Sequence, residues 1–253
     1  MNLLLINPNT SQSVSDLIEA EARRAAAPQT RVSVLTAPFG VAYIETRFES
    51  LIGAYAAATL AAEHWEQHDA IVVAAFGDPG IEGLREAFDI PVIGMTEAAL
   101  MSACLLGKRF SIVAISRRIT AWYRECVQAN GLLDRLASIR CLDQPLQDIG
   151  RVQDDHGERL KALCLSAVDD DGADVIVIAG ASLAGLARSM KSEIPVPMVD
   201  GVSSAVNHAQ TLVSLAPAPA RRGSFAPPPI KPNQGLPPGI ERLLAGRRSA
   251  GLA

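Results

Sequence analysis

A short polar motif follows the first apolar segment of the sequence. Asn9, Thr10 and Ser11 come after the apolar residues 3–6, and Pro8 stops the strand expected there. Side chains of these types can orient a small polar ligand through hydrogen bonds. Thr10 and Ser11 could equally cap the helix that comes next. Asn9 is therefore the better candidate for a ligand contact.

Three carboxylates are candidates for general acid or base catalysis. Asp78 lies in the turn Phe76–Gly80, Glu97 follows the apolar segment 91–94, and Asp200 precedes the last expected helix. Each has a structural alternative. Asp78 could hold its turn, whereas Glu97 and Asp200 could stabilise the first turn of a helix.

Ser182 is a candidate nucleophile. It lies between an expected strand and an expected helix, as in a nucleophile elbow, but the final glycine of G-x-S-x-G is replaced by Ala184. Of the four histidines, His208 is the only plausible base for it. Helix capping is the favoured alternative for Ser182.

The composition excludes several classes of function. A net charge of −4 and a pI near 5.6 argue against a nucleic-acid surface. No apolar run reaches the ~18 residues of a membrane span, and no signal peptide is recognisable. We therefore expect a cytoplasmic protein with a small-molecule substrate. The four cysteines form no zinc-binding pattern, and there is no glycine-rich dinucleotide loop, so we expect neither a metal nor an organic cofactor.

Apolar segments typical of buried strands alternate with segments typical of helices along residues 1–215. The expected strands are 3–6, 31–35, 69–75, 91–94, 110–115, 138–142, 174–179 and 197–199. The expected helices are 12–26, 49–67, 80–88, 97–106, 120–130, 154–169, 183–191 and 202–215. This alternation predicts an α/β fold with parallel sheets.

The sequence also contains an internal repeat. Residues 69–75, with the turn, helix and strand after them, resemble residues 174–180 and their own turn, helix and strand, 105 residues later. Any two strand–helix–strand units look alike to some degree, but the repeat favours two pseudo-symmetric parallel-sheet α/β subdomains. We expect the first to comprise residues 1–98 plus 202–215 and the second residues 99–201. Residues 216–253 form a proline-rich tail, which we expect to be extended and to lie outside the core, with a short helix at about 239–244.

If the two halves pair about a pseudo-twofold axis, ligand contacts are expected at equivalent strand ends of both. Ligands of open α/β sheets bind outside the carboxyl ends of the strands, where Ala75 and Gly180 would be equivalent. Backbone N–H groups after both residues suit a carboxylate or an oxyanion. Phe39 and Tyr43, on the loop after the second strand, could shield the substrate from water. The expected substrate-binding residues are Asn9, Thr10, Ser11, Phe39, Ala75, Phe76, Gly77, Gly180 and Ala181.

Three motifs together resemble the hydantoin and allantoin racemase branch of the aspartate/glutamate racemase superfamily. They are Ile6–Ser11, Phe76–Gly80 and Asp200–Val202, and the resemblance covers about residues 1–215. It implies two α/β subdomains with the active site between them, without a metal or an organic cofactor. It also implies two cysteines, one from each half, that flank the substrate carbon and exchange its proton.

This sequence departs from the family pattern at both cysteine positions. The resemblance places them at Ala75 and Gly180, and neither residue can transfer a proton. If only the cysteine at position 75 were missing, Ala75 would suit a variant engineered to trap a ligand. Because Gly180 also stands where a cysteine is expected, a natural cysteine-free branch is favoured.

Three functions therefore remain open. The first is racemisation or another isomerisation of a small carboxylate or cyclic ureide by Asp78, Glu97, Ser182 or Asp200. The second is a hydrolase, lyase or decarboxylase reaction on the same scaffold, and the third is binding without catalysis. In each case we expect a homo-oligomer that binds neither nucleic acid nor membranes.

Overall fold

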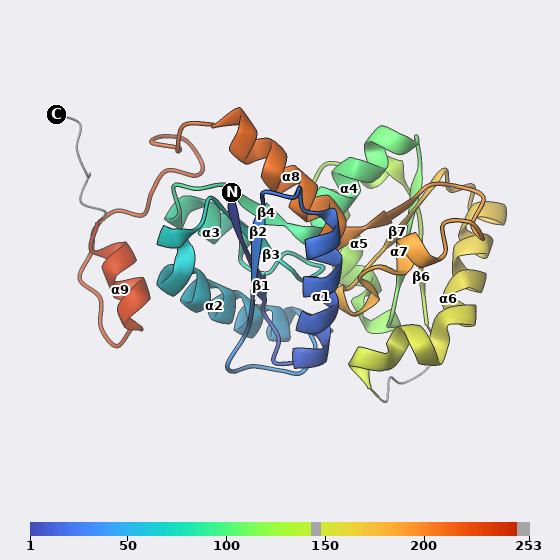
Figure 1. Cartoon of the computed structure of the whole chain (residues 1–253), viewed down its shortest axis with the longest axis horizontal. Coiled ribbons are helices and arrows are strands. Elements are labelled where there is room, and N and C mark those ends of the chain that lie inside the picture. Colours follow the sequence, from blue (N-terminus) through green and yellow to red (C-terminus); the bar gives the residue numbers. More distant parts are fainter. Residues whose placement is uncertain (143–147, 247–253) are drawn as a thin grey trace.

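The computed structural model describes residues 1–142 and 148–246, which form two four-stranded parallel sheets (Figure 1). The first sheet has the order β2-β1-β3-β4, with β1 (Asn2–Asn7), β2 (Arg31–Thr36), β3 (Ala70–Val73) and β4 (Val92–Gly94). The second has the order β6-β5-β7-β8, with β5 (Phe110–Ala114), β6 (Leu136–Cys141), β7 (Val175–Ile178) and β8 (Met198–Asp200). The predicted α/β class with two parallel sheets is confirmed.

Helices connect and cover the strands. They are α1 (Gln12–Ala25), α2 (Arg47–His64), α3 (Ile81–Ala87), α4 (Met95–Leu106), α5 (Thr120–Ala129), α6 (Val152–Asp169), α7 (Leu186–Ser189), α8 (Gly201–Leu215) and α9 (Pro238–Leu244). Because helices cover both faces of each sheet, the central strands β1, β3, β5 and β7 are almost wholly buried. This explains why their sequences are continuous apolar runs rather than alternating ones.

The helices α4 and α8 cross between the two sheets. α4 follows the last strand of the first sheet but contacts β7 and β8, whereas α8 follows the last strand of the second sheet and contacts β3 and β4. The two helices also contact each other, and Ser102 Oγ lies 3.1 Å from His208 Nε2 between them. One apolar core consequently runs from Leu5 in β1 to Ile112 in β5. The predicted domain boundaries, which place residues 202–215 with the first half, agree with these contacts and stay a prediction.

Local signals move some helix ends from their expected positions. α2 begins at Arg47 because Thr46 and Glu49 form a capping box, in which the Glu49 carboxylate also accepts the Thr46 N–H. The expected helix 183–191 is shorter: a 3₁₀ turn (Ala181–Leu183) comes first, and Gly185 with φ +85° separates it from α7.

The C-terminal tail lies against the first sheet's helices. Residues 216–237 are extended, as their prolines dictate, but α9 returns to contact α2 (Figure 1). Ile240 and Leu243 are partly buried in the apolar cluster beneath α2, and Arg221 pairs with Asp89 at 3.3 Å. The expectation that the whole tail lies outside the core is therefore wrong for α9. None of the described helices is long and apolar enough to span a membrane.

We expect truncation after Ala216 to destabilise the protein without preventing folding. The truncation removes Ile240 and Leu243 from the cluster beneath α2, and partial burial of two aliphatic side chains is worth about 2–4 kcal/mol. Urea unfolding of the truncated chain should show one cooperative transition with a free energy of unfolding lowered by this amount. Leu215→Ala in the full chain is the control, because that side chain is 69% exposed. An unchanged midpoint after truncation would contradict the role assigned to α9.

Candidate active site

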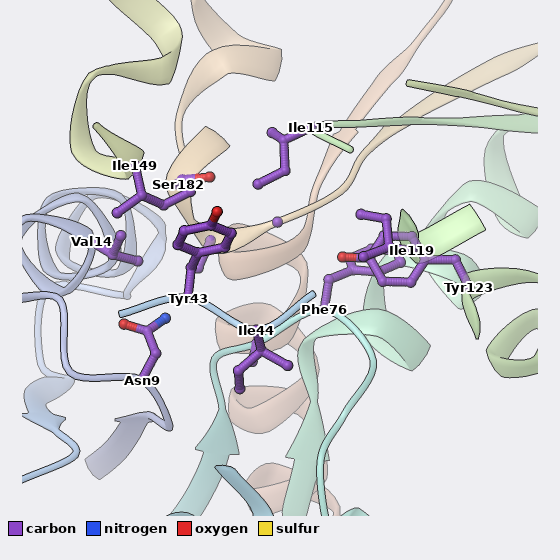
Figure 2. A pocket seen from close by; sticks show the side chains of 13 residues that line it. Asn9, Val14, Tyr43, Ile44, Phe76, Ile115, Ile119, Tyr123, Ile149 and Ser182 are labelled. Atoms are coloured by element: carbon purple, nitrogen blue, oxygen red, sulfur yellow. The ribbon is translucent and has the colours of Figure 1, made fainter. Parts of the chain in front are cut away.

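A small cavity lies where the carboxyl ends of the two sheets meet (Figure 2). Its volume is about 40 Å³, enough for a few water molecules. It is lined by Asn9, Val14, Tyr43, Ile44, Ala75, Phe76, Ile115, Ile119, Tyr123, Ile149, Gly180, Ala181 and Ser182. The lining therefore comes from both halves of the chain.

The structure brings Ala75 and Gly180 to the same cavity. Each follows the central strand of its own sheet, β3 or β7, by two residues. The backbone differs between them: Gly180 has φ +112°, in the region that favours glycine, whereas Ala75 has an ordinary negative φ. A Cβ at position 180 would have space, since the nearest atom, Ser182 Oγ, would be 3.8 Å away. At position 180 it is therefore the backbone conformation, and not a lack of space, that disfavours a cysteine.

A hydrogen-bond network fixes the direction in which the Asn9 amide faces. Asn9 Oδ1 accepts from Asn7 Nδ2 at 3.1 Å and from the Ser11 N–H at 2.9 Å. Asn7 is itself fully buried and also donates to Ser15 Oγ at 2.9 Å. Because these contacts occupy Oδ1, the NH₂ group of Asn9 is left to donate (Figure 2). Asn9 is thus a hydrogen-bond donor in the cavity wall, and its contact with a substrate stays a prediction.

The neighbours of Asn9 serve the fold instead. Ser11 caps α1, and its hydroxyl accepts from the Val14 N–H at 3.5 Å. The Thr10 N–H donates to the Val41 carbonyl at 2.9 Å and so anchors the loop that follows β2. The structural alternative stated for Thr10 and Ser11 fits this placement, and neither residue lines the cavity. Phe39 also lies outside the lining: it is 39% exposed and its ring is 5.9 Å from that of Tyr55.

Three hydroxyl groups line the cavity, on Tyr43, Tyr123 and Ser182. Ser182 lies in the 3₁₀ turn after β7 and is 4% exposed. His208, the base expected for a catalytic serine, instead lies 3.1 Å from Ser102 Oγ on the crossing helices, and the residues that line the cavity include no His, Asp or Glu. The backbone N–H groups of Ala181 and Ser182 donate to no group within the described residues, so they remain available to a ligand. The Gly77 N–H, in contrast, donates to Thr96 Oγ1 at 2.6 Å.

Tyr123 was not found by sequence reasoning. It is 3% exposed, and its ring packs at a tilt against Phe76, with ring centroids 4.6 Å apart, and against Trp122, with centroids 5.7 Å apart. Burial raises the pKa of Tyr123 well above its usual value, and Cys126, Cys141, Asp78 and Glu45 raise it further. Within α5 its position follows the apolar face of the helix and carries no motif, so only the three-dimensional structure reveals its place in the lining.

Asp78 accepts hydrogen bonds at the start of α4. Its carboxylate accepts from the Thr96 N–H at 2.7 Å and the Glu97 N–H at 2.9 Å, and its own φ is +46°. Gly94 packs directly against this carboxyl group, because a Cβ there would collide with it. Burial raises the pKa of Asp78 to about 7. Asp78 therefore links the turn after β3 to the helix after β4.

Glu97 and Asp200 occupy comparable positions. Glu97 accepts the Gly94 N–H at 3.0 Å and forms an ion pair with Arg85. Asp200 accepts from the N–H groups of Val202 at 2.9 Å and Gly185 at 2.7 Å, and burial raises its pKa. None of the three carboxylates lines the cavity at Ala75 and Gly180. Asp78 and Glu97 instead border a separate hollow of about 510 Å³ beside α3 and α5. Their catalytic role stays a prediction, whereas their role at helix N-termini is observed.

Within the described residues, no group of three or more His, Cys, Asp or Glu side chains could hold a metal ion. The free cysteines lie elsewhere in the fold: Cys104, Cys126 and Cys164 are on α4, α5 and α6, and Cys141 ends β6. None of them lines the cavity.

The model of the Asp/Glu/hydantoin racemase family matches residues 3–209. The chain belongs to this family. The hydantoin racemase of Paenarthrobacter aurescens is 34% identical to it, over 91% of this chain and 99% of the relative. The allantoin racemase from Klebsiella pneumoniae, also 34% identical, superposes with a TM-score of 0.89 over 93% of this chain and 96% of that chain. A second allantoin racemase, from Pseudomonas fluorescens, is 32% identical with a TM-score of 0.86, over 93% of this chain and 100% of that chain. The protein is accordingly a racemase- or isomerase-like enzyme of the Asp/Glu/hydantoin racemase family.

We expect the buried Asp78 carboxyl to make stability depend on pH. Its folded pKa of about 7 lies above the ordinary 3.8, so the folded state binds the proton more tightly than the unfolded state. The resulting stabilisation is complete below pH ~4 and is lost as pH rises through about 7. Relative to Asp78→Asn, the free energy of unfolding of the wild type should fall by up to about 4 kcal/mol over this range. Urea titrations at several pH values measure it, with the exposed Asp134→Asn as control. A slope unchanged in Asp78→Asn would contradict the assignment.

We expect cysteine to be tolerated better at position 75 than at position 180. Ala75→Cys adds one sulfur in the cavity lining, whereas Gly180→Cys places a side chain on a backbone with φ +112°. Such strain costs about 1–3 kcal/mol. Thermal unfolding of the two single variants should show the larger loss for Gly180→Cys, with Gly180→Ala equally affected. Equal stability of the Ala75 and Gly180 variants would indicate that the backbone at 180 relaxes freely.

Proposed function

We propose that this protein binds a cyclic ureide, such as a hydantoin- or allantoin-like ring, in the cavity between the sheets. It then isomerises the ring at its hydrogen-bearing carbon, using neither thiols nor a cofactor. The observation that carries the proposal is the chemistry of the lining: hydrogen-bond donors from both halves of the chain and no charged side chain.

The donors suit a ring with carbonyl acceptors. The Asn9 amide and the backbone N–H groups of Ala181 and Ser182 can donate. The carbonyl oxygens of a cyclic ureide are acceptors, and the same donors would stabilise the oxyanion that forms when the adjacent carbon loses its proton.

The absence of charge among the lining residues separates a ureide from a dicarboxylate. No Lys, Arg or His is in the lining to neutralise a carboxylate, and burying an uncompensated charge is costly. A neutral ring avoids that cost. The 34% identity to a hydantoin racemase and an allantoin racemase supports the same choice.

The cavity must widen before a ring can enter. A volume of about 40 Å³ is far too small for a five-membered ring with substituents, and the Tyr43 side chain reaches into this space from the loop after β2 (Figure 2). Tyr43 lies on the segment between Val41 and Thr46, whereas Asn9, Ala75 and Gly180 follow buried strands, so we take the Tyr43 side chain as the part of the wall that moves. Entry of the ligand therefore requires Tyr43 to swing aside and then to close over the ring.

A lining without a carboxylate, thiol or imidazole also fits a protein that binds without reacting. This second candidate predicts saturable binding of the same rings with no exchange of hydrogen at carbon. Optical rotation and proton NMR of enantiopure 5-substituted hydantoins and allantoin in D₂O distinguish the two functions: the isomerase removes the optical rotation and replaces the ring proton by deuterium.

We expect Asn9→Asp to weaken ureide binding about 10- to 100-fold, because a carboxylate cannot donate and an unsatisfied buried polar group costs about 1–3 kcal/mol. Calorimetric titration with hydantoin measures the loss, with Asn207→Asp on the exposed side of α8 as the matched control. Binding of malonate or succinate, together with no binding of any ureide, would contradict the proposed substrate class.

A further inference from the structure

Two tyrosines point into the cavity from different sides. In Figure 2 the Tyr43 ring extends from the loop after β2 beside Ser182, and the Tyr123 hydroxyl enters from the opposite side, next to Phe76. Tyr43 belongs to the first half of the chain and Tyr123 to α5 of the second half.

The Tyr123 hydroxyl has no partner within the described residues, although the residue is only 3% exposed. In the described part of the chain, every side-chain nitrogen or oxygen atom that is fully buried has a hydrogen-bond partner. The Tyr123 hydroxyl oxygen is therefore not fully buried. It faces the cavity, where a ligand can reach it. A buried phenol left unpaired costs stability unless something else satisfies it, so the position points to a ligand contact.

The surroundings fix each ring in a different way. Tyr123 packs against Phe76, the residue after Ala75, so its hydroxyl lies on the side of the cavity that carries Ala75. Tyr43 comes from a loop fixed at one end by the Thr10–Val41 hydrogen bond and at the other by the capping box of α2. It is the more exposed of the two and can exchange its proton with water.

No other side chain of the lining competes for proton transfer. The remaining polar side chains are those of Asn9, which does not titrate, and Ser182, which lacks a base beside it. The Asp78 carboxylate lies outside the lining and accepts hydrogen bonds at the start of α4.

We propose that Tyr43 and Tyr123 are the proton-transfer pair of this enzyme, one phenol for each face of the ring carbon, in place of two thiols. The inference rests on the proposed function and adds to it the groups that move the proton. Each tyrosine is catalytic in the strict sense, since its oxygen would contact the reacting carbon's hydrogen.

The proton transfer balances in atoms and charge. One tyrosine first loses its proton to water. The resulting phenolate takes the hydrogen of the ring carbon as a proton, and the C–H electron pair moves into the neighbouring carbonyl, whose oxyanion accepts hydrogen bonds from the lining. The other phenol then donates its proton to the opposite face of the same carbon. The first tyrosine is then a neutral phenol again, the second is a phenolate that takes up a proton from water, and the ring leaves as its mirror image.

The environment of the pair determines its pH dependence. Burial raises the pKa of Tyr43, as do Glu45 and Glu49. Burial also raises the pKa of Tyr123, with further contributions from Cys126, Cys141, Asp78 and Glu45. Both groups are therefore neutral phenols at pH 7, and the phenolate that begins the reaction is a minor species. Turnover should rise about tenfold per pH unit through the neutral and alkaline range, with no plateau below pH ~10.

Tyrosine-to-phenylalanine variants test the pair, because they remove only the hydroxyl. We expect Tyr123→Phe and Tyr43→Phe each to lower racemisation at least about 100-fold, with KM changed less than about threefold. Tyr55→Phe, the third tyrosine of the chain and 45% exposed outside the lining, is the matched control.

The decisive readout is hydrogen exchange of each pure enantiomer in D₂O. A variant with one remaining phenol should still exchange the ring hydrogen of one enantiomer without inverting it, and the other variant should do so for the opposite enantiomer. A structural role for either tyrosine would slow both enantiomers equally. Suppose that the wild type is active, and that both variants either stay active or lose hydrogen exchange for both enantiomers together. This result overturns the tyrosine pair and leaves the proposed function standing. A wild type that exchanges neither enantiomer of any ureide overturns both.

Discussion

Two buried carboxylates hold the cavity floor together. Asp78 connects the turn after β3 to the N-terminus of α4, and Asp200 connects the loop after β7 to the N-terminus of α8. Both therefore join the connections of neighbouring strands at the carboxyl end of a sheet, although Asp78 comes from the inner strand and Asp200 from the outer one. The positions of Ala75 and Gly180, of Phe76 and hence of the Tyr123 ring packed against it depend on these hydrogen bonds. Carboxylates that look catalytic in the sequence thus act on the site by holding its backbone.

The absence of charged side chains from the cavity lining follows from this placement of the carboxylates. Because helix N-termini take up the carboxylates, the space between the sheets keeps only neutral groups. In a poorly hydrated cavity neutral donors interact strongly with an oxyanion, and no like charge in the lining repels it. The same neutrality leaves the cavity lining without a carboxylate, thiol or imidazole.

The strands and their parallel order could be predicted because buried parallel strands carry an unmistakable apolar run, as at 69–75 and 174–179. The crossing of α4 and α8 could be inferred from the repeat. The position of Asn9, Ala75 and Gly180 beside one cavity could also be predicted, because the order of the motifs and the topology bring these residues to the carboxyl ends of the strands. Tyr123 was missed because a tyrosine on a helix face has no local signature; its role arises only when α5 packs over the Phe76 turn. The docking of α9 was missed for the same reason, because proline-rich composition describes residues 216–237 and not the two aliphatic side chains beyond them.

The exchange of α4 and α8 between the sheets restricts how the molecule can open. Each half contributes a helix to the surface of the other, and a single apolar core passes beneath both. A hinge motion that parted the halves would have to pull these helices out of that core. Access to the cavity therefore falls to the loop that carries Tyr43. We infer that Tyr43, proposed above to move a proton, also controls entry to the cavity, so that each proposed catalytic cycle begins and ends with the displacement of one of its own reacting groups.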